Sequence, residues 1–166
     1  MKKVLKSIVI VVLSLGWIEQ ASAQATTTQN LTFAVNAVYK IATSGNPGPL
    51  TITSGTAGTD ALTSATDNST TYSITQNFGN TVKITAYLDA AMPAGYTLSL
   101  TLASTKGTSI PNVDISNALS GSAANMVTAI QIGADANQVI SYTFSALASA
   151  GTLGSTSRTI TLTITN

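Results

Sequence analysis

The chain has 166 residues and a formal net charge of +1, and only 8% of its residues are charged, against roughly 25% in an average soluble domain. It contains no histidine and no cysteine, which excludes Ser-His-Asp and Cys-His triads, structural zinc, iron–sulfur clusters and disulfide scaffolds. The length is that of one domain preceded by a leader.

Residues 1–23 are predicted to be a secretory signal peptide. Lysines at positions 2, 3 and 6 form a basic start, residues 7–15 form a short apolar run, and Ala21-Ser22-Ala23 is a small-residue cleavage pattern. The apolar run is shorter than the ~18–20 residues that a membrane-spanning helix needs. We therefore expect cleavage, a secreted or cell-surface protein of bacterial type, and no membrane span in the mature form.

The predicted mature chain, residues 24–166, is a single domain with almost no charge. It keeps four basic residues and five Asp, for a formal charge of −1, and carries 28 Thr and 16 Ser. No basic patch remains for nucleic acid. The hydroxyl side chains, rather than charges, are expected to keep its surface wettable.

Apolar residues alternate with polar ones in nearly every apolar segment, which is typical of half-buried β-strands. Glycine-, proline- and aspartate-rich turns separate these segments, most clearly at residues 45–49, 54–68 and 92–95. In chain order the predicted strands are 31–41, 50–53, 70–75, 81–88, 96–103, 126–132, 139–147 and 158–165, and residues 104–125 give no clear pattern.

This spacing predicts an all-β fold, an antiparallel immunoglobulin-like sandwich of about seven to eight strands. A parallel β-helix would show a fixed repeat length, and the sequence has none.

The only candidate metal site is a weak one for calcium. Asp60, Asp67 and Asn68 supply hard oxygen ligands in one loop, but without Asp-x-Asp spacing, and the alternative is that they cap turns. No cofactor is predicted. An enzyme would have to work with aspartates alone, and no residue is assigned a catalytic role.

Rows of hydroxyl side chains are a second candidate surface. Thr159, Thr161 and Thr163 are expected on one face of the last strand, as are Thr97, Ser99 and Thr101 on another. Such rows can order ice or dock another sheet, although β-branched threonine also simply suits a half-exposed strand. Tyr87 is out of phase with its apolar neighbours and is predicted to face solvent, where an aromatic ring can bind a glycan.

The N-terminal segment is a third candidate surface. A polar arm, residues 24–30, leads into the predicted strand, whose apolar face includes Leu31, Phe33, Val35 and Tyr39. Such a strand can join the open sheet edge of a neighbouring molecule, or it can be the first strand of its own sandwich. At the other end of the chain, only Arg158 protects the strand 159–165 against edge association.

The order of leader, alternating first strand, Pro93-Ala94-Gly95 turn before a Tyr96-Thr97-Leu98 strand, and closing Thr/Ile strand resembles small secreted bacterial β-sandwich proteins of the spore-coat-U and fimbrial-subunit type. The chain departs from the fimbrial pattern because it has no cysteine pair and ends in Thr163-Ile164-Thr165-Asn166 without an aromatic residue.

The resemblance implies a structural or adhesive protein outside the cell, with itself or another surface protein as partner. Together with the N-terminal segment, it predicts a self-assembling, fimbria- or fibre-like subunit that uses strand addition. The alternative is a carbohydrate- or ice-binding module.

Overall fold

The computed structural model describes residues 25–79 and 81–166. The chain divides into two units, Met1–Ala34 and Val35–Asn166. In the first unit, residues 25–34 form no helix or strand and are exposed. The predicted signal peptide lies outside the described residues.

The second unit is built from nine β-strands and one short 3₁₀ helix, η1, and its described residues contain no α-helix. The elements are β1 (Tyr39–Thr43), β2 (Ala65–Gln76), β3 (Val82–Leu88), β4 (Tyr96–Leu102), β5 (Thr108–Ser109), β6 (Val113–Asp114), β7 (Ala124–Ile130), β8 (Gly133–Ala146), η1 (Ala148–Ala150) and β9 (Ile160–Thr165).

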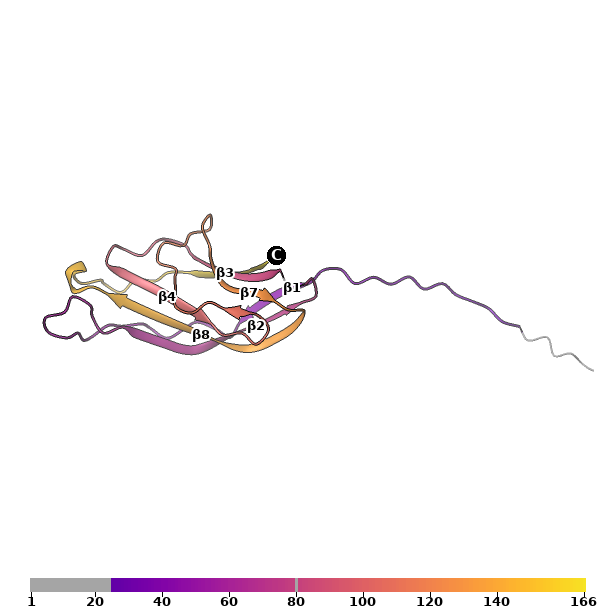
Figure 1. The fold of residues 1–166 in the computed structure, drawn as a ribbon, viewed down its shortest axis with the longest axis horizontal. Coiled ribbons are helices and arrows are strands. Elements are labelled where there is room, and N and C mark those ends of the chain that lie inside the picture. The colour runs from indigo at the N-terminus through magenta and orange to yellow at the C-terminus, as the bar shows by residue number, and fades with distance from the viewer. Residues whose placement is uncertain (1–24, 80) are drawn as a thin grey trace, which may run out of the picture. The chain divides into compact units, whose positions relative to one another are not determined.

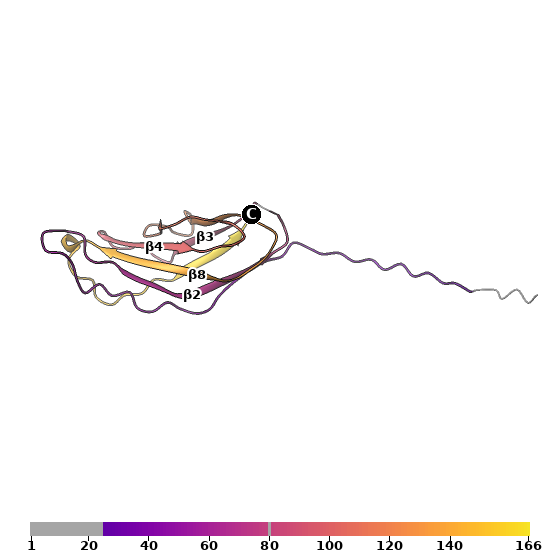
Figure 2. The same ribbon diagram turned by 60° about the horizontal axis from the view of Figure 1, so that its bottom comes forward.

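The strands form two antiparallel sheets. One sheet has the order β1-β2-β8-β4-β6 and the other has the order β5-β7-β3-β9. The two long strands β2 and β8 run side by side, with β4 on the far side of β8 (Figures 1 and 2). The edge strands are therefore β1 and β6 in the first sheet, and β5 and β9 in the second.

One apolar core lies between the sheets, and it follows from the alternation in the sequence. In β4 every second residue, from Tyr96 to Leu102, is buried, and the residues between them are half-exposed. The core cluster takes its members from both sheets, among them Tyr72, Ile84, Leu100, Val127 and Ile140. The all-β prediction and the antiparallel pairing are confirmed.

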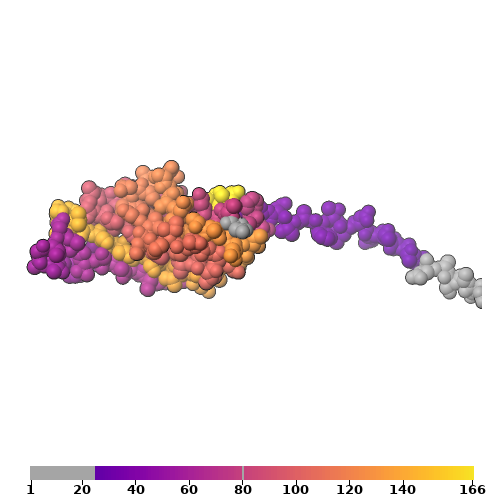
Figure 3. Space-filling model, in the orientation of Figure 1, coloured from indigo at the N-terminus to yellow at the C-terminus, as the bar shows by residue number. Residues whose placement is uncertain are grey.

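The strand count and several boundaries differ from the prediction. The structure has nine strands where about seven to eight were expected, because residues 104–125 contribute the short edge strands β5 and β6. This segment also lies in the middle of the face shown in Figure 3. The predicted strand at 50–53 is absent, since those residues have no regular structure. The strand β2 begins at Ala65, five residues before the predicted start, because polar residues there pair with β8.

The largest error concerns the predicted first strand, 31–41. Strand pairing begins only at Tyr39, where β1 joins β2. Residues 31–38 alternate as a strand would, but no neighbouring strand pairs with them. Alternation shows that a segment can bury one face, and does not show which molecule buries it.

Among the residues that the structure describes, one charged side chain is buried in the fold. Asp135, at the start of β8, is only 3% exposed. Its carboxylate accepts hydrogen bonds from the Ser104 and Thr105 hydroxyls, at 2.8 and 2.7 Å, and from the Thr105 and Lys106 N–H groups, at 2.9 and 3.2 Å. These bonds fasten the loop after β4 to β8, so Asp135 has a structural role.

Candidate functional site

The N-terminal arm, defined here as residues 31–38, carries large apolar side chains in water. Leu31, Phe33 and Val35 are 81%, 85% and 87% exposed. In an extended chain these three residues lie on one side, because side chains alternate with a period of two. Isolated exposed apolar residues are ordinary, but a row of three of them at strand spacing is the pattern of a contact surface.

Asn77 holds the end of the arm next to β1. Its side-chain oxygen accepts a hydrogen bond from the Val38 N–H at 2.7 Å, and its amide group donates to the Asn36 carbonyl at 3.0 Å. The Asn77 N–H also donates to the Val38 carbonyl, at 3.3 Å. The Asn77 side chain thus binds the Val38 N–H and the Asn36 carbonyl, which a neighbouring strand would otherwise bind. Tyr39, the first residue of β1, lies next to Phe78, with ring centroids 5.6 Å apart.

The strand β9 is an edge with unpaired backbone groups. It pairs with β3 alone. The Thr159 carbonyl accepts from the Asp89 N–H on the β3 side, and backbone groups of a strand alternate between its two sides. The N–H and C=O groups of Ile160, Leu162 and Ile164 therefore point to the open side.

The core is also incomplete along β9. On β3 the inward side chains Val82, Ile84, Ala86 and Leu88 are at most 1% exposed. The β9 residues paired with the last three of them, Ile164, Leu162 and Ile160, face the same core but are only partly buried. β3 has a strand on each side, whereas β9 is the edge of its sheet and contacts only β1 of the other sheet beyond that edge, so its inward side chains are less covered than those of β3.

A groove of about 920 Å³ adjoins β9. Both sheets line it: Leu98 and Leu100 of β4, Tyr142 and Phe144 of β8, and Ile160 and Leu162 of β9. The loops at residues 45–52 and 151–159 also contribute to its walls. Its single charged side chain, Arg158, donates to the Ala91 carbonyl at 3.2 and 3.4 Å. The groove is therefore lined by a mixture of apolar and uncharged polar side chains, with Arg158 as the charged one.

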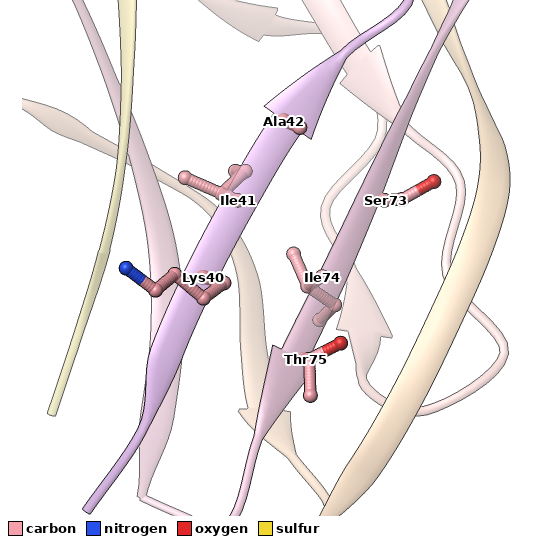
Figure 4. Close-up of a pocket in the computed structure, with 6 residues that line it drawn as sticks. All are labelled: Lys40, Ile41, Ala42, Ser73, Ile74 and Thr75. Carbon is pink, nitrogen blue, oxygen red and sulfur yellow. The ribbon is translucent and has the colours of Figure 1, made fainter.

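A second and smaller depression, of about 290 Å³, lies over β1 and β2 (Figure 4). Its six lining residues run from Lys40 to Ala42 and from Ser73 to Thr75, paired across the two strands. They present no constellation of catalytic or metal-binding groups, and the depression is a surface feature of strand pairing.

The predicted threonine rows lie on different sheets. Thr161 and Thr163 are on β9, paired with Tyr87 and Thr85 of β3, and Thr159 just precedes the strand. The other row, Thr97, Ser99 and Thr101, is on β4 in the five-stranded sheet, where it pairs with Ser145, Thr143 and Ser141 of β8. The two predicted rows do not combine into one surface. The β8 residues that do flank the second row could not be identified from the sequence, because pairing partners are distant in the chain.

Tyr87 is half-buried. In its strand it lies between the buried residues Ala86 and Leu88, on the outward face opposite Thr161. Its phase in the sequence predicts a ring that faces solvent, but Tyr87 packs against the core cluster and is partly buried. No second aromatic residue is paired with it in the register of β3 with β9.

The three candidate calcium ligands do not form one cluster. Both carboxylate oxygens of Asp60 accept hydrogen bonds from Ser149, at 2.8 and 2.7 Å. Asp67 accepts from the Ser69 hydroxyl and N–H, at 2.8 and 3.1 Å, and from the Gly48 N–H at 3.3 Å. The Ser69 bonds, chiefly, lower the pKa of Asp67. Asp67 therefore caps its own turn, as the alternative predicts, whereas Asp60 links its loop to Ser149 of η1.

The third residue, Asn68, is exposed in β2. Within residues 25–79 and 81–166, no group of three or more acidic, histidine or cysteine side chains is placed to hold a metal ion.

Comparisons with known proteins give no relative: no family model matches the chain, and no curated protein sequence matches it. Among the residues that the structure describes, no helix is long and apolar enough to span a membrane.

Proposed function

We propose that this protein is an exported structural subunit with an immunoglobulin-like sandwich, which self-associates outside the cell by adding its N-terminal arm as a strand to a neighbouring molecule. The observation that carries the proposal is the exposure of Leu31, Phe33 and Val35 in a segment whose sequence alternates as a strand does. Export rests on the predicted leader, and the surface role agrees with the fimbrial-type resemblance.

The physical reason is the cost of leaving the arm in water. Burying one side chain of this size is worth about 1.5–3 kcal/mol, and a strand that joins a sheet also pairs its backbone groups. An arm of this composition is therefore stabilised by a sheet edge that accepts it. The near absence of charge in the chain removes the repulsion that usually keeps sheet edges apart.

The test is a double substitution on the apolar side of the arm. The variant Phe33→Asn with Val35→Asn removes two anchors, about 3–6 kcal/mol of burial, which corresponds to self-association weakened by a factor of about 10²–10⁴. Light scattering after size exclusion measures the molar mass of the secreted full-length product, and negative-stain microscopy shows its form.

The matched control is Thr32→Asn with Ala34→Asn, which makes the same change on the opposite side of the same arm. The control is expected to assemble like the unchanged protein. A protein that is monomeric with its arm intact, or a control that loses assembly as fully as the double variant, would contradict the proposal.

A further inference from the structure

We propose that the groove between the two sheets binds a free fatty acid, with its alkyl chain on the inner face of β4 and β8 and its carboxylate on the guanidinium of Arg158. This inference goes beyond the proposed function. It concerns a small-molecule ligand of a single copy, and it needs neither the N-terminal arm nor self-association.

One wall of the groove is an elongated apolar stripe. On β4, Tyr96, Leu98 and Leu100 all line the groove, because alternate residues of a strand share a face. These three positions span about 13 Å along the strand. On β8, Phe144 and Tyr142 line the groove directly beside Leu98 and Leu100, with which they are paired. A stripe of this shape suits a single unbranched chain.

The two tyrosines of this wall offer apolar ring surface, because their hydroxyl groups are already engaged. The Tyr96 hydroxyl donates to the Ala150 and Gly151 carbonyls, at 3.3 and 3.2 Å. The Tyr142 hydroxyl accepts a hydrogen bond from the Thr70 hydroxyl at 3.2 Å. A ligand on this wall is therefore held by the burial of its carbon atoms rather than by directional bonds.

The opposite wall is made by two loops that leave the space unfilled. Residues 45–52 and 151–159 line the groove and form neither helix nor strand. Pro47 and Pro49 lack the N–H group that strand pairing requires, and a Cβ added at Gly154 would meet no atom within 4 Å. The groove measures about 920 Å³, within the ~300–1,000 Å³ that is typical of small-molecule sites.

Arg158, the charged side chain of the groove, supplies a place for an anionic head group. Its guanidinium donates to the carbonyls of Ala91 and Ser157 and to the Thr156 hydroxyl. These acceptors are uncharged, so they fix the guanidinium in position without neutralising it. A guanidinium forms strong, charge-assisted hydrogen bonds with a carboxylate. An apolar stripe with a cation beside it therefore fits a long-chain carboxylate.

Calorimetric titration of the full-length protein with octanoate, decanoate and dodecanoate tests the apolar stripe. We expect the affinity to rise about fourfold for each added CH₂ group, because each buried CH₂ contributes to binding by leaving water. Equal affinity for the three acids, or no binding of any of them, would overturn the proposal.

Two substitutions of Arg158 test the head group. Arg158→Gln should weaken decanoate binding about tenfold, since the charge-assisted bonds are lost, and should leave the increase per CH₂ unchanged. Arg158→Lys keeps the charge and should restore part of the affinity. The matched control is Lys40→Gln, which removes one positive charge at an exposed position of β1 outside the groove. An equal loss in Arg158→Gln and Lys40→Gln would overturn the assignment of the carboxylate.

A pair of glycine substitutions tests the location. Gly154 lines the groove and Gly121 does not, and an added Cβ would meet no atom within 4 Å at either position. We expect Gly154→Trp to weaken decanoate binding at least tenfold and Gly121→Trp to leave it unchanged, and this comparison decides the proposal if Arg158→Gln does not fold. Equal binding by the two variants would overturn the assignment of the groove.

Molar mass measured on the same samples separates this inference from the proposed function. A monomer that binds decanoate with the expected chain-length and Arg158 dependence would support the fatty-acid site and refute self-association. An assembled protein that binds no fatty acid would refute the site and leave self-association standing.

Discussion

The buried carboxylate of Asp135 gives the sharpest stability prediction. Replacing it by alanine removes four hydrogen bonds to the loop 104–106. It also leaves the Thr105 N–H without its acceptor, whereas the Lys106 N–H keeps the Ser104 hydroxyl oxygen at 3.2 Å. An unsatisfied buried donor costs about 1–3 kcal/mol, so we expect Asp135→Ala to lower the free energy of unfolding by about 3–5 kcal/mol.

The asparagine variant should be milder, because the geometry of the site suits it. One carboxylate oxygen, Oδ2, accepts from Ser104 Oγ and from the Thr105 and Lys106 N–H groups, and the other, Oδ1, accepts only from the Thr105 hydroxyl. An asparagine can place its oxygen toward the three donors and donate its amide hydrogen to the hydroxyl. It loses only the charge-assisted part of the bonds, about 1–2 kcal/mol.

The same carboxylate should also make the free energy of unfolding depend on pH in the acid range. Burial alone raises the pKa of Asp135, but the hydrogen bonds from Thr105, Ser104 and the Lys106 N–H outweigh it and hold the pKa below its usual value of 3.8. Because the folded protein binds this proton less readily than the unfolded chain does, the stabilisation is fully present above pH 3.8 and is lost as the pH falls below it. The Asp135→Asn variant should lack this part of the acid dependence.

Urea unfolding followed by circular dichroism, at pH 7 and at pH 3, measures both effects. Asp114→Ala is the control, since Asp114 is exposed and its carboxylate accepts one hydrogen bond, from the Ser116 N–H at 2.8 Å; it should cost less than about 1 kcal/mol. Equal stability of Asp135→Ala and Asp114→Ala at pH 7, or an alanine variant more stable than the asparagine one, would refute the reasoning.

Two further predictions concern the fold. Burial raises the pKa of Tyr72 to about 12, so its neutral form stabilises the fold and this contribution is lost as the pH rises above 10; alkaline unfolding monitored by circular dichroism should be less steep for Tyr72→Phe, and an unchanged profile would contradict this. Gly95 has φ +84°, and an added Cβ would lie 2.5 Å from the Ala150 Cβ. We expect Gly95→Ala to cost about 1–3 kcal/mol in thermal unfolding, whereas Gly154→Ala, with open space at its Cβ, should be near neutral; equal costs would show that the φ and the contact are unimportant.

The sequence predicted strands well where one face of the strand packs against the core of the same molecule. The alternation in 96–103 matches β4 almost residue by residue, and the alternation in 158–165 contains β9. Alternation does not predict strands that form because a neighbouring strand pairs with them. The polar start of β2 is a strand because β8 lies beside it, and β5 and β6 are two residues long and are held only by β7 and β4.

By itself, the sequence determined the fold class, through the period of two, and identified Leu31, Phe33 and Val35 as one apolar row. The sequence does not show whether that row is buried. The period of two indicates which side chains can share a face, but it does not indicate which residues cover that face. Only the tertiary structure placed the start of pairing at Tyr39, left the row exposed and opened a groove beside β9. Those three facts depend on contacts between residues far apart in the chain, which local patterning does not encode. The near absence of charge, visible from composition alone, acquires its physical meaning there, since no charged side chain of the arm opposes its pairing with another strand.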